Sequence, residues 1–314
     1  MEKSQKLTSG QKAIVTVGAF VITFISVCAF FKGDIKFLLT SKSVERKFGK
    51  TVENSYFIED NFNYINNYTK TEVNSKQDII DSIYYLINSG VTYSKRYCGK
   101  DYKSCYEDMN AISENTDALS VLNNYVHPFN SFENITFNFD NNTIEIKIKH
   151  LYSDKDKEVI NDAVDKIINK KITNNMSTKE KIKTIHDYII NTTDYDTLKT
   201  ENINDKTYRS NTAYGVLIEH YGICSGYSDA MALFLDKMNI INYKISNDQH
   251  VWNLVYLDGT WLHLDLTWDD PVSDKNITRD NYFLITTNTL KKLDDNVHYF
   301  SNDLFPETTS TKNS

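Results

Sequence analysis

The chain has 314 residues, which is enough for two domains, and with 40% hydrophobic and 25% charged residues its composition is that of an ordinary globular protein. Its formal net charge of -7 at pH 7 and its sequence pI of about 5.5 argue against a nucleic acid partner. No cluster of Lys and Arg is long enough to form a phosphate-binding surface, so we expect no nucleic acid in the function.

The first distinctive segment is a 19-residue stretch without a formal charge, residues 13–31, which follows three lysines. As a helix it would be about 28 Å long, close to the thickness of the bilayer hydrocarbon core. We expect a single-pass anchor with residues 1–12 in the cytoplasm and the rest of the chain outside the cell membrane. A cleaved signal peptide, with a small-residue site at Val27 and Ala29, is the alternative and would give a secreted protein.

Residues 32–150 are expected to form a small α+β region. Apolar residues at helical spacing in 77–89, followed by Gly90, predict an amphipathic helix. Apolar and polar residues alternate in 132–139 and again in 143–149, on either side of a turn, which predicts a β-hairpin with one buried face.

Two of the four cysteines, Cys98 and Cys105, lie in this small region. If the region is exported, its compartment permits a disulfide, and the polar residues 99–104 could close as a loop. No metal is expected here, because two thiols without a neighbouring histidine are too few ligands. A disulfide and a pair of free thiols both remain open.

Residues 151–305 are expected to form the second domain, and residues 306–314 have the composition of a disordered tail. Ser177 and Glu180 form a capping box that opens a helix. His186, on that helix, is expected to be structural.

Cys224 lies at the head of an apolar periodic run that predicts a further helix. The unpaired N–H groups and the positive dipole end of a helix N-terminus favour the thiolate, the nucleophilic form of cysteine. Taken alone, a cysteine in this place is more often an inert buried thiol. A reactive one needs a base nearby.

A base is offered by a predicted hairpin, in which residues 250–257 and 260–267 flank Asp258-Gly259, a strong two-residue turn signal. In this register His250 and Asp265 are diagonal neighbours on one face, within side-chain reach. The other face is almost wholly apolar and is the expected core side. His263 shares the face of His250 and is a rival base.

A cysteine nucleophile, an imidazole base and an orienting carboxylate form the triad used for acyl transfer. Tyr195 or Tyr214 could supply a hydroxyl to an oxyanion, although either could equally be packing. Trp252 and Trp261 lie on the same predicted face as His250. They could line the substrate groove and exclude water from a thioester, or they could merely pack the sheet against the catalytic helix. The polar stretch 194–211 is expected to be a loop that forms a wall of the groove. Asp269-Asp270 offers too few oxygens for calcium, so we expect no metal.

Four groups of residues in this order resemble the core motifs of the transglutaminase-like superfamily: Gly222-Ile223-Cys224-Ser225-Gly226-Tyr227, His250-Val251-Trp252-Asn253, Asp258-Gly259-Thr260-Trp261 and Asp265-Leu266-Thr267-Trp268-Asp269-Asp270-Pro271. The resemblance covers roughly residues 177–300. It implies a papain-like α+β core in which Cys224 is the nucleophile, His250 the general base and Asp265 the residue that orients His250. Val251 departs from the family's preferred alanine, a small change on the core face.

The expected function is that of an extracytoplasmic cysteine enzyme without a cofactor. Cys224 would attack a carboxamide or peptide carbonyl of a protein or peptide at the cell surface, and water or an amine would resolve the thioester. The family that the chain resembles includes both crosslinking and hydrolytic members, so the resemblance does not decide between an amine and water. The alternative from another class is a surface interaction module that keeps the fold without turnover, and the intact triad favours the enzyme.

Overall fold

The computed structural model describes residues 54–59, 65–270, 280–293, 296–302 and 305, and every helix and strand named below lies in one unit, Tyr56–Ser314. The expected anchor at 13–31, the cytoplasmic residues 1–12 and the tail at 306–314 lie outside the described residues. Among the residues that are described, no helix is both long and apolar enough to cross a membrane. The boundary expected at residue 150 falls inside the unit and stays a prediction.

The N-terminal part of this unit contains a sheet with the strand order β1-β2-β4-β3, in which β1 runs parallel to β2 and the other neighbours are antiparallel. Its strands are β1 (Glu72–Val73), β2 (Tyr93–Cys98), β3 (Phe132–Asp140) and β4 (Thr143–His150). Strands β3 and β4 form the predicted hairpin, which turns at Asn141 and Asn142, both with positive φ. Asparagine tolerates this backbone region better than most residues.

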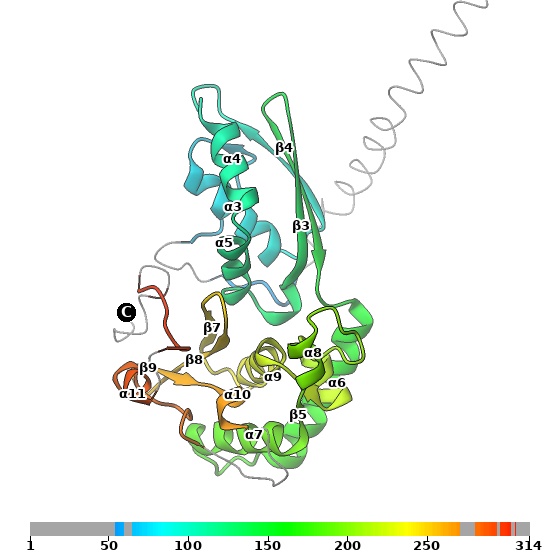
Figure 1. Cartoon of the computed structure of the whole chain (residues 1–314), viewed down its shortest axis with the longest axis vertical. Coiled ribbons are helices and arrows are strands. Elements are labelled where there is room, and N and C mark those ends of the chain that lie inside the picture. The colour runs from blue at the N-terminus through cyan, green and yellow to red at the C-terminus, as the bar shows by residue number, and fades with distance from the viewer. Residues whose placement is uncertain (1–53, 60–64, 271–279, 294–295, 303–304, 306–314) are drawn as a thin grey trace, which may run out of the picture. The chain divides into compact units, whose positions relative to one another are not determined.

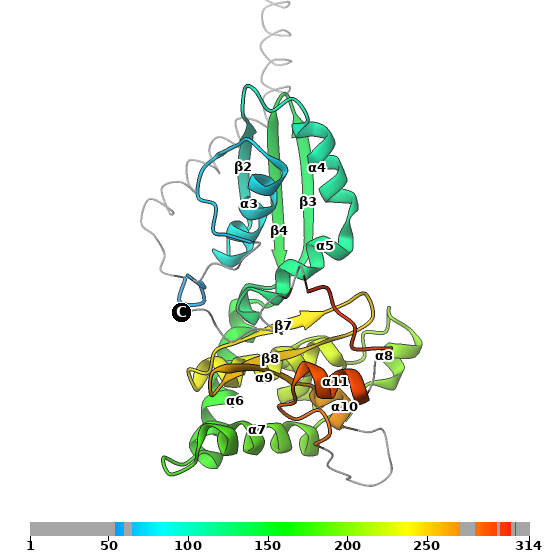
Figure 2. The ribbon, with the colours of Figure 1, turned by 90° about the vertical axis from the view of Figure 1, so that its left-hand side faces the viewer.

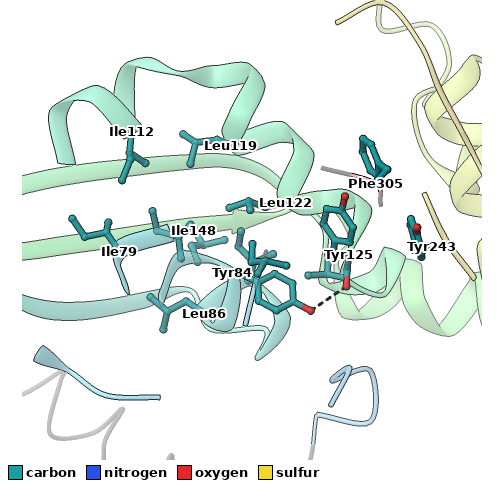
Figure 3. Packing of buried hydrophobic residues seen from close by; sticks show 14 of the residues in the cluster. Ile79, Tyr84, Leu86, Ile112, Leu119, Leu122, Tyr125, Ile148, Tyr243 and Phe305 are labelled. Carbon is teal, nitrogen blue, oxygen red and sulfur yellow. Dashed lines mark hydrogen bonds between the residues drawn. The ribbon is translucent and has the colours of Figure 1, made fainter. Parts of the chain in front are cut away.

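One face of this sheet is covered by helices α3 (Lys76–Asn88), α4 (Cys105–Glu114) and α5 (Thr116–Val121) (Figures 1 and 2). Helix α3 is the helix expected at 77–89. A disulfide between Cys98 and Cys105 joins the end of β2 to the start of α4, with the two Cα atoms 6.0 Å apart. Figure 3 shows the core beneath the helices, where the hydroxyl of Tyr84 donates to the carbonyl oxygen of Tyr125 at 3.2 Å.

The C-terminal part is built on an antiparallel sheet of order β7-β8-β9, with β7 (Asn242–Ser246), β8 (Val251–Leu257) and β9 (Thr260–Leu264). Three longer helices accompany it: α6 (Asp154–Lys171), α7 (Thr178–Thr192) and α9 (Cys224–Lys237). Helix α7 opens with the predicted capping box of Ser177 and Glu180. Apolar residues of α7 and α9 form one core cluster with Val255 of β8, Leu264 of β9 and Leu266, which follows β9.

Short elements connect these parts. They are η1 (Leu122–Asn124), η2 (Pro128–Asn130), β5 (Asp194–Tyr195), α8 (Thr197–Glu201), the π-helical turn η3 (Gly215–Glu219), β6 (Tyr221–Gly222), α10 (Leu266–Asp269) and α11 (Thr287–Leu293). The polar stretch 194–211, expected as a loop, therefore begins with a strand that pairs in parallel with β6 and continues into α8. The part of the chain that the structure describes is a mixed α+β fold.

The β8–β9 hairpin has the predicted two-residue turn and register, from Leu257 opposite Thr260 to Asn253 opposite Leu264. The expected continuation of the second strand to residue 267 is wrong. Strand β9 ends at Leu264, because the carboxylate of Asp265 caps the backbone N–H groups that follow it and starts α10.

The hairpin was expected to have one core face and one face that carries the chemistry, but much of the second face is buried as well. Trp252, Leu254 and Trp261 are buried in a second cluster, which contains no residue of α9. Tyr282, Phe300 and Phe305 pack into that cluster from the C-terminal end of the chain. Long-range packing of this kind leaves no signal in the strand itself.

Candidate active site

Cys224 is the first residue of α9 and is the free, partly exposed cysteine of the described chain. The preceding strand β6 is fixed by β5, where Tyr195 is paired with Gly222. Gly226 allows the start of the helix to approach neighbouring backbone, because a Cβ there would lie only 2.2 Å from the carbonyl oxygen of Ser210. The sequence thus places the thiol at a helix N-terminus, as predicted.

His250 lies directly before β8, in a turn organised by Asn247. The side-chain oxygen of Asn247 accepts the backbone N–H groups of Gln249 at 2.8 Å and His250 at 2.9 Å. The imidazole of His250 stacks on the indole of Trp252, with ring centroids 5.6 Å apart. The turn and the stacked ring together fix the direction of the imidazole.

The imidazole of His250 is hydrogen-bonded to Asp265, with Nε2 2.5 Å from Oδ2. An ionised carboxylate only accepts hydrogen bonds, so Nε2 carries the proton and Nδ1 is left to serve Cys224. The other oxygen, Oδ1, accepts the backbone N–H groups of Thr267 at 2.9 Å and Trp268 at 3.3 Å. The helix cap and the imidazole therefore hold the same carboxylate from two sides.

Burial and charge act against each other in this pair. Burial alone would lower the pKa of His250, but the negative charge of Asp265, the hydrogen bond to it and the interaction with Cys224 raise the pKa to about 10. Burial would raise the pKa of Asp265, but the charge and hydrogen bond of His250 and the hydrogen bond from His298 hold it well below its usual range. At neutral pH the pair is an aspartate and an imidazolium.

His298 is a member of this cluster that the sequence reasoning missed. Its Nε2 lies 2.8 Å from the same Oδ2 of Asp265, and its side chain is fully buried. The ligand-type atoms of His250, Asp265 and His298 all lie within 4.8 Å of one another. The only signal in the sequence is a histidine in a polar C-terminal stretch, which does not by itself point to the site.

His263, the rival base, has both ring nitrogens in structural hydrogen bonds. Its Nδ1 accepts the indole N–H of Trp252 at 3.0 Å, and its Nε2 donates to the hydroxyl of Thr287 at 2.9 Å. Burial lowers the pKa of His263 to about 3, with the nearby charge of His298 and of Lys291 acting in the same direction. Because both ring nitrogens of His263 are hydrogen-bonded to core residues and its imidazole is neutral, His263 is a packing residue.

His186 and the acidic pair after β9 also have structural partners. The Nε2 of His186 bonds to Asp269 at 3.1 Å, which ties α7 to α10. Asp269 accepts in addition the backbone N–H of Tyr282 at 3.0 Å, and Asp270 accepts the hydroxyl of Tyr227 at 2.5 Å. These carboxylates are used within the fold.

The three predicted groove residues differ in their placement. Tyr195 is half-buried and near enough to Cys224 that, after burial, the charge of the cysteine contributes to raising its pKa. The ring of Tyr214 lies 4.4 Å beneath the guanidinium of Arg209. Trp252 is only 1% exposed, so its expected contact with substrate is wrong. Trp268, 37% exposed and in edge contact with His250, is the indole at the surface.

The fold and the site define an α+β protein with a helix-head cysteine beside a buried histidine–aspartate pair. Residues 165–266 match the family model described as the transglutaminase-like superfamily. The chain therefore carries a domain of the transglutaminase-like superfamily, which includes cysteine acyltransferases and peptidases and is generally enzymatic.

A solved structure described as the crystal structure of a TGase is similar over 43% of this chain and 44% of its own, with 16% sequence identity and a TM-score of 0.34. The chain thus spans less than half the length of that structure. No curated protein matches the chain.

Proposed function

We propose that the protein is a cysteine acyl-transfer enzyme that acts on carboxamide or peptide carbonyls of proteins through a thioester. The observation that supports it is the arrangement of a partly exposed Cys224 in hydrogen-bond contact with a buried His250, which is held 2.5 Å from a buried Asp265. Such a site keeps the reacting thiol accessible and protects the charges that prepare it from water.

In the proposed first step, the sulfur of Cys224, as thiolate, adds to the carbonyl carbon. The negative charge that develops on the carbonyl oxygen is accepted by the backbone N–H of Cys224 at the helix start, with the Tyr195 hydroxyl as a second donor. His250 gives its Nδ1 proton to the leaving nitrogen, the C–N bond breaks, and an amine or ammonia departs. The product on the enzyme is a thioester.

In the second step, water or a primary amine attacks the thioester while His250 takes the proton of the attacking group. The C–S bond breaks and the thiolate is restored, with an imidazolium beside it. Asp265 stays ionised throughout and stabilises the imidazolium. Water gives hydrolysis and an amine gives transamidation.

Whether an amine or water attacks the thioester depends on how well nearby side chains exclude water. Trp252 and Trp261, expected to exclude water from the thioester, are 1% and 6% exposed and belong to the core. Trp268 is the indole that remains to shield the site. We therefore keep both outcomes within the proposed function.

The location that we propose is extracytoplasmic, by an anchor at residues 13–31 or after cleavage of that segment. The uncharged stretch and the Cys98–Cys105 disulfide both support it, because disulfides persist in oxidising compartments. Membrane fractionation followed by protease treatment of intact cells tests it. A chain that stays protected in intact cells would contradict the proposal.

The test of function uses the purified full chain with a glutamine-rich acceptor protein and a fluorescent primary amine. Label incorporation without fragments is the result for transamidation, and fragments without label are the result for a peptidase. Cys224→Ala is the control and should abolish either activity. If neither activity appears across several acceptors, the proposal fails and a surface interaction module becomes the better account.

A further inference from the structure

The carboxylate of Asp265 accepts hydrogen bonds at both of its oxygens. Oδ1 accepts two backbone N–H groups, from Thr267 and Trp268, and Oδ2 accepts two imidazole N–H groups, from His250 at 2.5 Å and His298 at 2.8 Å. Two carboxylate oxygens offer about four lone-pair directions, so this set fills them. A triad of cysteine, histidine and aspartate needs only one of these four donors.

Asn247 ties His298 to the same turn that orients His250. Its side-chain oxygen accepts the backbone N–H of His250, while its side-chain nitrogen donates to the carbonyl oxygens of Val297 at 2.7 Å and Tyr299 at 2.8 Å. The residues on either side of His298 are therefore fixed by the amide that fixes His250. The hydroxyl of Tyr299 also bonds to Asp248 of this turn.

Aromatic rings enclose the imidazole of His298. Tyr282 stacks on it with centroids 5.0 Å apart and an interplanar angle of 22°, and Trp252 and Trp268 each contact it edge-on at 5.0 Å. Its side chain has no exposed surface. Water is thus kept from the second lone pair of Oδ2, and the donor there cannot be exchanged for solvent.

We propose that His298 is a positioning residue for the reaction, which holds the Asp265 carboxylate so that His250 stays directed at Cys224. Its N–H occupies the lone pair of Oδ2 that His250 leaves open, so the carboxylate can neither rotate nor shift toward His250. The inference rests on the proposed function, and it places a necessary part of the site at residue 298, beyond the matched residues 165–266.

The test compares three single variants of the full chain in a Cys28→Ser background, in which Cys224 is the one cysteine outside the Cys98–Cys105 disulfide. His298→Leu removes the donor, His298→Gln keeps an N–H that can reach Oδ2, and Phe300→Leu loosens the same segment while leaving His298 in place. The rate constant for alkylation of Cys224 by iodoacetamide at pH 7 is measured for each. A hydrogen bond to a buried charge predicts a loss of roughly tenfold or more for His298→Leu, with His298→Gln within about threefold of the parent. Phe300→Leu should alkylate like the parent.

A second readout does not depend on Cys224. Proton NMR of the parent should show a downfield imidazole N–H resonance for the His250–Asp265 bond, which His298→Leu should shift or broaden and His298→Gln should restore. If Cys224 of the parent is unreactive while this resonance behaves as stated, the proposed function fails and the positioning role stands.

Two results would overturn the positioning role. One is that His298→Leu and His298→Gln have the same alkylation rate constant and the same N–H resonance as each other. This would hold if both variants match the parent, or if both lose reactivity together with a lower melting temperature. The other is one tightly bound zinc per chain that either substitution removes, since the cluster would then be a metal site.

Discussion

Replacing Asp265 by Asn changes little in shape but removes the charge that His250 requires. The amide can no longer stabilise an imidazolium, and it presents a donor where two imidazoles already donate. Turnover should fall by roughly 10³- to 10⁴-fold. His263→Leu is the comparison, because the rival base is bonded elsewhere and its loss should leave most activity in place.

The comparison is measured as turnover of the amine or peptide substrate that the function test identifies, with circular dichroism to confirm folding. Near-native activity of Asp265→Asn together with an inactive His263→Leu would mean that His263, and not the His250–Asp265 pair, acts in the reaction.

Single residues of the site were predictable where the signal is local. Cys224 heads an apolar periodic run, and Asp258-Gly259 fixes the hairpin that brings His250 to Asp265. His298 was not predictable, because it reaches Asp265 only through the packing of a segment 33 residues further along the chain. Sequence spacing carries no information about such a contact.

Among the elements, the β8–β9 turn offers a clean test of backbone conformation. Gly259 has φ +84, and a Cβ added there would meet no atom within 4 Å, so the cost of a side chain is conformational alone. Gly259→Ala should lower the free energy of unfolding by about 1 kcal/mol. Asp258→Asn, at φ 50, should be nearly neutral because asparagine tolerates this region. Urea unfolding of the three proteins measures both, and an equal stability of Gly259→Ala and parent would contradict the turn.

The disulfide between β2 and α4 should stabilise the N-terminal sheet without supporting the site. It closes a loop with a sequence separation of 7, for which chain entropy predicts a contribution of about 2–3 kcal/mol. Replacing Cys98 and Cys105 by serine should lower the free energy of unfolding by that amount, as measured by urea unfolding, and leave the alkylation rate of Cys224 in the folded protein unchanged. A loss of Cys224 reactivity without unfolding would show that the two parts are coupled.

Helices and strands were predicted correctly where the residues that determine them are close together in the sequence. The capping box at Ser177 and the hairpin turning at Asn141-Asn142 were both placed correctly from the sequence. The end of β9 was not, because an aspartate in a strand pattern and an aspartate that caps a helix look alike until the following N–H groups are seen to turn toward it. A short strand, β5, was missed because two residues carry no period.

For the molecule as a whole, His263 should make stability depend on pH. Burial lowers its pKa to about 3, against an ordinary value of about 6.5, so between these values the unfolded chain binds a proton that the folded chain does not. Stability should therefore fall as the pH falls through this window. The contribution is at most about 1.4 kcal/mol for each pH unit.

The measurement is the free energy of unfolding of parent and His263→Leu at pH 7, 6, 5 and 4. The variant lacks the hydrogen bonds to Trp252 and Thr287 and should be less stable at pH 7, but the difference should shrink toward pH 4. Other titrating groups cancel in the difference. A gap that stays constant with pH would mean that the pKa of His263 is the same in the folded and the unfolded chain.

At the scale of the whole molecule the sequence predicted the mixed α+β fold class, since helix and strand periods are local. It did not predict that both faces of the β8–β9 hairpin are buried. The residues that cover the second face, among them Phe300 and Phe305, come from the far end of the chain and are apolar residues in an otherwise polar stretch. Where these residues pack depends on the sheet that the rest of the chain forms, so their own sequence does not show it.

The paired Cys98 and Cys105 and the free Cys224 impose opposite redox demands on one molecule. Conditions that keep the disulfide closed also expose the partly accessible sulfur of Cys224 to peroxide, and the described chain holds no second free cysteine to trap a sulfenic acid as a disulfide. Oxidation of Cys224 would then proceed to the irreversible sulfinic acid. If the proposed location outside the cytoplasm holds, exposure to oxidants limits how long each molecule stays active, and a mild reductant that spares the disulfide would extend that time.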